Sequence, residues 1–349
     1  MEISLENDWQ AWESWNSVHG TVFQSASFAE TVKNSGMGVE LVVAREGGSI
    51  VGGCFVFLPF PRFPLRFFGE YRIVNGPILV DYDEAYLFPI LSFIEKRARI
   101  IGAMTLPIKF PQPDLDFTLE KKGYTVPRHA PSYSFIIDLT KSEKLLWEGL
   151  DKKTRTAIRK SQKNSVTIRQ AHASEMRTVY SLYMQRAKAK KNWIPYPSSF
   201  FQASMGTREN NATLFVAEYQ GKLIAEAMFL HYNKTIFYFN NGSLPAYWNL
   251  CANSQLVWEG MLLGKKLGCK NMDLYGTTDG RNKDDLNYSL YQFKASFGGT
   301  LVHTNTFASQ CLAPIRKKVW DILVPIVLPF YKVWSESCSG GGFDEYTTR

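Results

Sequence analysis

The sequence predicts a mixed α/β protein with two domains that share one order of helices and strands. Its 349 residues are too many for one ordinary domain core and suit two. Hydrophobic residues make up 45% of the chain, which is enough to bury a large core. The third observation is an internal duplication of architecture, because a β-hairpin and the elements around it occur twice.

Two β-hairpins carry this duplication. Residues 39 to 58 contain two β-rich runs joined by a Gly-Gly turn, and residues 212 to 232 repeat the design with Gln-Gly at the turn. Glycine suits such turns because it adopts positive φ angles at no steric cost. We expect both hairpins to have buried faces.

The elements around each hairpin follow in the same order. A helical stretch precedes the hairpin, and a further strand, a helix and another strand follow it. The expected ranges are 25 to 35, 73 to 80, 83 to 102 and 103 to 108 in the first half, and 174 to 205, 235 to 239, 250 to 267 and 271 to 275 in the second. This is the order of the GNAT acyltransferase fold, so we predict two tandem GNAT-like domains that face a shared cleft.

The boundary between the domains is predicted where the strand SFIIDL ends at Lys141 and a helix begins near Glu143. The first GNAT-like domain is then expected at residues 1–140 and the second at 141–310. A C-terminal helix and a flexible tail are expected at 311–349.

Residues 314 to 334 are apolar and aromatic with basic residues at both ends. Pro325 and Pro329 interrupt the segment and Asp321 lies inside it, so it is too broken to span a bilayer. Two interpretations stay open, a helix packed against the protein and an anchor on an anionic membrane surface.

The charge of the chain favours an anionic partner. Forty Lys and Arg against 32 Asp and Glu give a net charge of +8, which suits RNA, a nucleotide-linked substrate or an acidic membrane surface. The alternative interpretation is that the basic residues form a solvated helix face. The basic residues gather in two groups: Lys152, Lys153, Arg155, Arg159, Lys160 and Lys163, and then Arg186, Lys188, Lys190 and Lys191.

The cysteines indicate neither a disulfide framework nor a metal site. There are five, an odd number, far apart, with no CxxC and no His at zinc-ligand spacing. A reducing cytoplasm fits this usage. The N-terminus lacks the basic start and apolar run of a signal peptide, so we expect a cytoplasmic protein, with the inner face of the membrane as a further location.

Several segments resemble one family. Residues 146–171 contain a helix with repeated Arg and Lys followed by a short strand, and residues 238–269 contain an aromatic strand, a turn of small residues, Asn before a helix and Trp-Glu. The most specific element is MDLYGTTDG at 272–280 followed by LYQFKASFGG at 290–299, which is similar to a strand, Gly turn and Phe-Lys-x-x-Phe-Gly signature. With the entry helix at 22–36, these segments resemble the Fem family of aminoacyl-tRNA-dependent transferases.

The resemblance implies an aminoacyltransferase that moves an amino acid from aminoacyl-tRNA to the amine of a peptide acceptor, with a peptidoglycan precursor as the expected acceptor. The acceptor could be nucleotide-linked or lipid-linked. No cofactor and no metal are expected, and a monomer is expected. The alternatives are a CoA-dependent N-acyltransferase of the GNAT superfamily, a tRNA-dependent enzyme acting on a small peptide natural product, and a scaffold without catalysis.

The resemblance also implies roles for individual residues. Lys294, with Phe293, would lie at the acceptor end of the tRNA, where a fixed cation stabilises the oxyanion that develops on the ester carbonyl. Arg186 and Lys33 would bind phosphate of the acceptor. Tyr238 would present a hydroxyl to the acceptor peptide, with core packing as the equal alternative. The basic residues expected near the tRNA are Lys152, Lys153, Arg155 and Arg159.

Two departures from the family pattern limit the roles that the resemblance implies. Many relatives have Asp-Pro after the fifth strand of the first half, where this chain has Phe110-Pro111, so no general base is assigned. A CoA-dependent enzyme binds pyrophosphate with a Gly-rich loop at the start of the helix after the fourth strand. This chain has LCANSQLVWEG there, which disfavours CoA.

Overall fold

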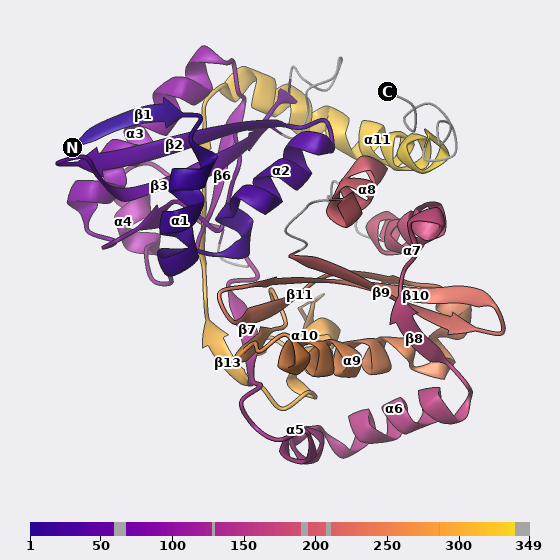
Figure 1. The fold of residues 1–349 in the computed structure, drawn as a ribbon. Helices are drawn as coiled ribbons and strands as arrows, with labels where there is room; N and C mark the ends of the chain where they lie inside the picture. The colour runs from indigo at the N-terminus through magenta and orange to yellow at the C-terminus, as the bar shows by residue number, and fades with distance from the viewer. Residues whose placement is uncertain (59–67, 128–129, 190–194, 207–210, 286, 339–349) are drawn as a thin grey trace. The chain divides into compact units, whose positions relative to one another are not determined.

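The computed structural model describes residues 1–58, 68–127, 130–189, 195–206, 211–285 and 287–338 (Figure 1). Lys190, Lys191 and the tail at 339–349 lie outside the described residues. The chain divides into two compact units, and each is described by itself. Unit 1 comprises Met1–Ser134, Gly276–Tyr288 and Leu301–Asp321, and unit 2 comprises Phe135–Tyr275, Ser289–Thr300 and Ile322–Arg349.

Unit 1 contains the first predicted hairpin, which is confirmed as β2 and β3 joined at Gly47 and Gly48, both with positive φ. Its strands form a sheet of order β1-β2-β3-β5 and a second sheet of order β14-β6-β4. The strand predicted at 73 to 80 is two short strands that belong to different sheets. The elements are β1 (Glu2–Glu6), α1 (Trp9–His19), α2 (Ala26–Asn34), β2 (Gly38–Glu46), β3 (Ser49–Leu58), β4 (Ile73–Val74), β5 (Ile78–Leu79), α3 (Glu84–Ile100), β6 (Thr105–Phe110), α4 (Asp116–Lys121) and β14 (Thr306–Cys311).

Unit 2 is built on a seven-stranded sheet of order β13-β7-β12-β11-β10-β9-β8. Helices α7 and α8 cover one face, and α9 and α10 cover the other (Figure 1). The elements are β7 (Tyr133–Asp138), α5 (Glu143–Gly149), α6 (Lys152–Lys163), β8 (Thr167–Gln170), α7 (Met176–Ala189), α8 (Ser198–Gly206), β9 (Ala212–Tyr219), β10 (Lys222–Tyr232), β11 (Thr235–Ser243), the 3-10 helix η4 (Pro245–Leu250), α9 (Ala252–Lys266), β12 (Asn271–Asp273), α10 (Tyr288–Ala295) and β13 (Thr300–His303).

The second predicted hairpin is confirmed as β9 and β10, with Gln220 and Gly221 at positive φ in the turn. The helical stretch predicted at 174 to 205 is confirmed, and it contains two helices, α7 and α8. Pro195 and Pro197 precede the start of α8 at Ser198. Proline lacks the backbone N–H and disfavours helical φ and ψ at the residue before it, so α7 cannot continue into α8.

Two strands lie in the sheet of the other half of the chain. β7, at the end of the first half, pairs with β12, and β14, near the end of the second half, pairs with β6. The prediction divides the chain once, at residue 140. The structure differs from it, because unit 1 also contains residues 276–288 and 301–321 from the second half. The elements of both halves nevertheless follow the order predicted for tandem GNAT-like domains.

Strand β11 separates from its neighbour near the middle. It pairs in parallel with β12 only from Thr235 to Phe237, whereas its pairing with β10 continues to Ser243. The later part of β11 therefore has β10 on one side and, among the described strands, no ladder with β12 on the other.

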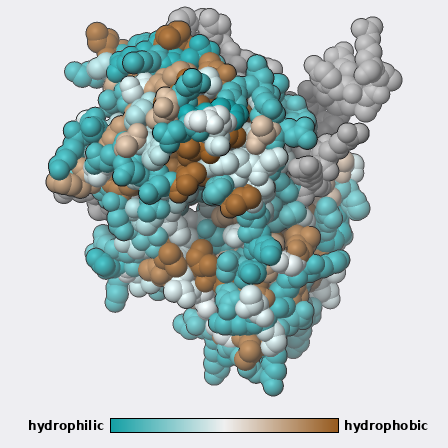
Figure 2. All heavy atoms as spheres, turned by 60° about the vertical axis from the view of Figure 1, so that its left-hand side comes forward, coloured by the Kyte–Doolittle hydropathy of each residue, from teal (hydrophilic) through white to brown (hydrophobic). Residues whose placement is uncertain are grey.

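Most large apolar side chains are buried, as hydrophobic burial requires. The face in Figure 2 is predominantly hydrophilic, with hydrophobic residues in small groups. The segment predicted at 314 to 334 forms one helix, α11 (Pro314–Cys338), with both prolines inside it. Within the described part of the chain, no helix has the length and apolar character needed to cross a membrane.

Candidate active site in unit 2

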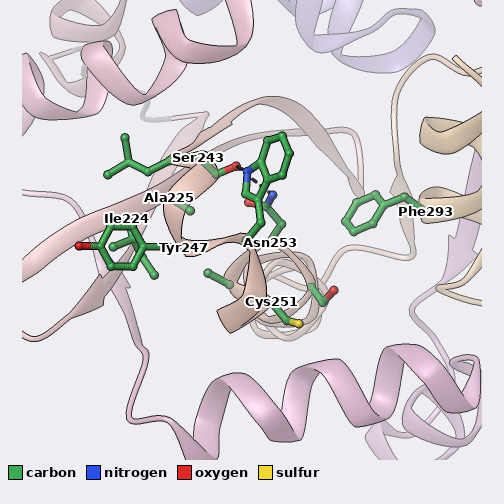
Figure 3. A pocket seen from close by; sticks show the side chains of 11 residues that line it. Ile224, Ala225, Ser243, Tyr247, Cys251, Asn253 and Phe293 are labelled. Atoms are coloured by element: carbon green, nitrogen blue, oxygen red, sulfur yellow. Dashed lines mark hydrogen bonds between the residues drawn. The ribbon is translucent and has the colours of Figure 1, made fainter. Parts of the chain in front are cut away.

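A pocket of about 220 Å³ opens at the N-terminus of α9, beside the end of β11 (Figure 3). The strand end contributes Ser243 and the helix start contributes Asn253. Aromatic rings come from η4, with Tyr247 and Trp248, and from α10, with Phe293. The pocket thus combines three aromatic rings with a few polar groups, the composition typical of small-molecule and cofactor sites.

Ser243 organises the polar side of the pocket. Its hydroxyl oxygen accepts hydrogen bonds from the indole N–H of Trp248 at 3.0 Å and from the amide Nδ2 of Asn253 at 3.2 Å (Figure 3). The backbone turns from η4 into α9 at Cys251, which has a left-handed conformation with φ 59°. These contacts fix Trp248 although 63% of its surface is exposed. A fixed, exposed indole is suited to stacking against a flat ligand.

Helix α10 carries the two residues predicted to act at the tRNA end. Phe293 lines the pocket and packs edge to face against the buried Phe297 at 5.2 Å between ring centroids. Lys294 is buried, and its Nζ donates to the carbonyl oxygen of Tyr275 at 2.6 Å. Tyr275 follows β12, so the ammonium group is held beside the place where β11 and β12 separate.

A glycine pair holds α10 in place. Gly298 has φ 77°, and a Cβ there would lie 2.3 Å from the carbonyl oxygen of Gly149. A side chain at this position is therefore excluded both by its φ and by the close approach of the α5 backbone. Gly299 also lies close to neighbouring backbone, because a Cβ there would lie 3.0 Å from the carbonyl oxygen of Ile136.

The basic helix α6 is tied to the end of α10. The amide of Asp151 donates to the carbonyl of Ser296, and the Thr154 and Ser296 hydroxyls are 2.8 Å apart. α6 also packs against α9 and η4, which carry the pocket. Of the residues predicted to bind tRNA, Lys152, Lys153 and Arg159 are exposed.

Arg155 differs from these three residues. It is half-buried, and its guanidinium donates to the carbonyl oxygens of Glu148 and Leu150. These contacts join the end of α5 to the start of α6, which indicates a structural use for this side chain. The chemistry of arginine, five donors in a fixed plane, suits such a link.

Arg186 and Tyr238 lie within unit 2. Arg186, on α7, donates a hydrogen bond to the side-chain oxygen of Asn241 on β11. Tyr238 is buried and its ring lies 5.7 Å from that of Phe229. Its hydroxyl has no hydrogen-bond partner among the described residues, and burial raises the pKa of this hydroxyl. Lys33 lies in unit 1, where its exposed Nζ is 5.3 Å from the ring centroid of Trp9.

Sequence reasoning missed Glu226, a fully buried carboxyl group in the centre of β10. The signal was a single acid inside the apolar run LIAEAMFL. It also missed Ser243, Trp248 and Asn253 as pocket residues, although all three lie in the segment that carries the family resemblance. Among the residues that the structure describes, no group of three or more His, Cys, Asp or Glu could hold a metal ion.

Comparisons with known proteins agree with this architecture. A family model described as an acetyltransferase (GNAT) domain matches residues 150–294. A UDP-N-acetylmuramoylpentapeptide-lysine N(6)-alanyltransferase from Weissella viridescens is 24% identical over 329 residues, which cover 85% of this chain and 92% of that protein.

Solved structures give the same fold over nearly the whole chain. The crystal structure of FemX has a TM-score of 0.68 at 16% identity and covers 93% of this chain and 100% of that one. A tandem GNAT protein from the clavulanic acid biosynthesis pathway has a TM-score of 0.57 at 12% identity and covers 89% of this chain and 98% of that one. The predicted resemblance to the Fem family is confirmed, and this chain has the tandem GNAT fold.

Proposed function

We propose that this protein is a monomeric aminoacyltransferase that moves an amino acid from aminoacyl-tRNA to the amine of a peptide acceptor, a peptidoglycan precursor. The observation that carries the proposal is the pocket at the start of α9, which Phe293 lines and beside which Lys294 is held on Tyr275. The similarity to the Weissella viridescens alanyltransferase, named for transfer to the lysine of UDP-N-acetylmuramoylpentapeptide, supports the reaction class.

A cation near the ester that links the amino acid to the terminal ribose of tRNA would stabilise the charge that develops in the reaction. The acceptor amine attacks the ester carbonyl, negative charge develops on its oxygen, and the ribose hydroxyl leaves. Lys294 is the group proposed to stabilise this charge. An ammonium has three N–H donors, so a lysine oriented by the Tyr275 carbonyl can also donate to an oxyanion. No general base is proposed.

The pocket suits the terminal adenosine of tRNA. Trp248, Tyr247 and Phe293 offer aromatic faces for a base, and polar groups at Ser243 and Asn253 suit a ribose. Helix α6, tied to α10 at Ser296, would contact the phosphates of the acceptor stem through Lys152, Lys153 and Arg159.

The acceptor is proposed to bind through its phosphates and its peptide. Arg186 and Lys33 are the proposed phosphate ligands, because Arg binds phosphate through two parallel hydrogen bonds and Lys binds it as a point charge. Tyr238 is proposed to face the acceptor peptide.

Helix α11 supports a peripheral membrane contact, which a lipid-linked acceptor would require. Its exposed side carries an apolar stripe at helical spacing, in which Ile322 is 71% and Phe330 is 73% exposed. Lys318 is also exposed on this helix, which suits an anionic lipid surface. The exposed apolar residues of the stripe are Ile315, Val319, Ile322, Ile326, Phe330 and Val333.

The membrane contact is tested by sedimentation with vesicles of phosphatidylglycerol. The wild type should sediment with these vesicles, and replacing Ile322, Ile326 and Phe330 by Ser should release it. Equal sedimentation of the two proteins would exclude the stripe as the contact.

The central experiment is transfer itself. The purified protein is incubated with a mixture of charged tRNAs and with UDP-N-acetylmuramoylpentapeptide or its lipid-linked form, and the products are analysed by mass spectrometry. We expect an acceptor heavier by one amino acid residue. A parallel incubation with acetyl-CoA tests the CoA-dependent alternative, and acetylation without aminoacyl transfer would refute the proposal.

A further inference from the structure

Glu226 is an acid in an unusual place. It lies in the middle of β10, has no exposed surface, and neither carboxyl oxygen has a hydrogen-bond partner among the described residues. A buried carboxylate without such partners is costly, because burial removes the water that would stabilise its charge. An acid kept at such a position therefore calls for a functional explanation.

The neighbours of Glu226 bring it close to Arg186. Glu226 pairs with Gly242 on β11, and a Cβ at Gly242 would lie 2.2 Å from the carbonyl oxygen of Leu182 on α7. Arg186 is one helical turn after Leu182 and reaches Asn241, the residue next to Gly242. Glu226 on β10 and Arg186 on α7 thus contact neighbouring residues of β11.

The field of Arg186 acts on Glu226. Burial raises the pKa of Glu226 to about 8, and the nearby Arg186 charge opposes this rise. In the described part of the chain, Tyr183 on α7 and Tyr238 on β11 are the phenols on which this carboxyl acts, and burial raises the pKa of both. The phenols stay neutral while Glu226 titrates, so Arg186 is the charged group that acts on Glu226 among the described residues.

We propose that Glu226 is a positioning residue that competes, when ionised, with an anionic substrate for the charge of Arg186. This inference rests on the proposed role of Arg186 as a phosphate ligand. While Glu226 is protonated, no negative charge on this carboxyl weakens the attraction between the guanidinium and a diphosphate group. Once Glu226 loses its proton, its carboxylate partly offsets the positive charge of Arg186, and the diphosphate binds more weakly.

Linkage makes this coupling reciprocal. A bound diphosphate offsets the Arg186 charge that favours the ionised carboxyl, so binding raises the pKa of Glu226 and the protein takes up a proton. Conversely, diphosphate affinity should fall as the pH rises from 7 to 9. The phosphate groups are already ionised in this range, because their last pKa is near 6. A coupling of about one pKa unit corresponds to an affinity loss of about tenfold.

The test uses UDP as the probe with the full chain, by isothermal titration calorimetry at pH 7, 8 and 9. The wild type should lose on the order of fivefold to tenfold in affinity across this range. Glu226→Gln, which mimics the protonated acid, should bind at pH 9 as the wild type does at pH 7. Glu226→Asp should restore the pH dependence in part.

Glu259 supplies the matched control. It lies on α9, burial raises its pKa, and no charged group contributes to that rise. Glu259→Gln should keep the wild-type dependence on pH. Infrared spectroscopy adds a direct readout, because the carboxyl band that Glu226→Gln removes should grow when UDP binds and should not grow in Arg186→Met.

Three results would overturn the proposal: no UDP binding at pH 7, an unchanged pH dependence in Glu226→Gln, or no growth of the carboxyl band on binding. None of these measurements involves tRNA. Failure of the proposed transfer reaction would therefore appear separately, as intact, pH-dependent UDP binding without aminoacyl transfer.

Discussion

The Nζ of Lys294 donates a 2.6 Å hydrogen bond to the carbonyl oxygen of Tyr275, whose backbone has a left-handed conformation with φ 51°. The lysine proposed for catalysis is thus oriented by backbone, although it is almost fully buried. Such preorganisation is what makes a fixed charge effective in a transition state. The same bond means that removing the ammonium also leaves a backbone carbonyl without this donor.

Lys294→Met is expected to lower the transfer rate by roughly 10²-fold or more, because the proposed oxyanion partner is lost, with little change in acceptor affinity. Lys294→Arg should rescue only in part, since the guanidinium places its charge differently. The measurement is kcat and KM for a proven substrate pair.

Lys265→Met is the control for structural effects. Lys265 donates to the carbonyls of Leu139 and Lys141, so this variant also removes an ammonium from backbone oxygens. Both Met variants should lose about 1–3 kcal/mol of unfolding free energy, but only Lys294→Met should lose transfer. A normal transfer rate in Lys294→Met would show that the chemistry lies elsewhere.

Phe293→Ala is expected to weaken binding of charged tRNA by about 1–3 kcal/mol, because this ring lines the pocket proposed for the terminal base. The fold should stay stable, since Phe293 is only half-buried. The neighbouring Phe297 is 1% exposed, and Phe297→Ala should instead cost about 3–5 kcal/mol of stability. Binding and urea unfolding, measured on both variants, separate the two roles. Equal tRNA affinity in Phe293→Ala and wild type would remove the pocket from the tRNA site.

Charge reversal on α6 should weaken tRNA binding and lower its salt dependence. Replacing Lys152, Lys153 and Arg159 by Glu removes exposed cations without touching the bonds of Arg155. Each lost phosphate contact should reduce the slope of log affinity against log salt by about 1. Filter binding at several salt concentrations measures this slope.

The control for that variant reverses three lysines at the other end of α9. Lys234, Lys266 and Lys270 are exposed and lie near the C-terminus of α9, whereas the pocket is at its N-terminus. Their replacement by Glu changes the net charge equally and should leave the slope nearly unchanged. If both triple variants bind alike, α6 has no particular role and acts as a solvated face.

Gly298→Ala is expected to lower the free energy of unfolding by more than the backbone strain at this position accounts for. The φ of 77° costs an L-residue about 1–2 kcal/mol, and the added Cβ would also meet the Gly149 carbonyl at 2.3 Å. Gly268→Ala isolates the strain, because its φ is 71° and nothing lies within 4 Å of the added atom. Denaturant unfolding should show that Gly298→Ala is much less stable than Gly268→Ala. Equal losses of unfolding free energy would show that α5 can move aside.

The ion-pair network at Arg169 predicts a dependence of stability on pH. Hydrogen bonds from Arg169 lower the pKa of Glu175 from 4.5 to about 2. A carboxyl whose pKa is lowered by folding contributes stability above its unfolded pKa and loses that contribution as the pH falls through its folded pKa. Arg169→Gln should therefore be less stable than wild type at pH 6, and the difference should vanish towards pH 2. A difference that persists at pH 2 would mean that packing, and not charge, is responsible.

Local patterns were sufficient to predict both hairpins. Gly47-Gly48 and Gln220-Gly221 adopt the positive φ angles that tight turns need, and the flanking runs pair along almost their full length. The start of α5 was also predictable, because the side chain of Ser142 accepts from the amide of Leu145 as an N-cap. Each of these features depends on residues that are neighbours in sequence.

The site depended on contacts that neighbours in sequence do not reveal. Glu226 and Arg186 are 40 positions apart, and the packing of α7 against Gly242, which pairs with Glu226, brings them near each other. Arg155 carries the same charge as Lys153, yet it alone reaches the carbonyls at the end of α5. Composition and spacing could not separate these two residues, because their difference lies in the contacts of Arg155 with backbone at the end of α5.

The exchange of β7 and β14 constrains how the polypeptide can fold as it leaves the ribosome. β6 ends at Phe110, but the strand that borders it, β14, begins only at Thr306. The sheet that contains β4 and β6 therefore keeps an unpaired backbone edge until almost the entire chain has been synthesised, and β7 must wait for β12 in the same way. Neither half of the gene encodes an autonomous folding module, so nascent chains truncated between residues 140 and 300 should require chaperones to stay out of aggregates.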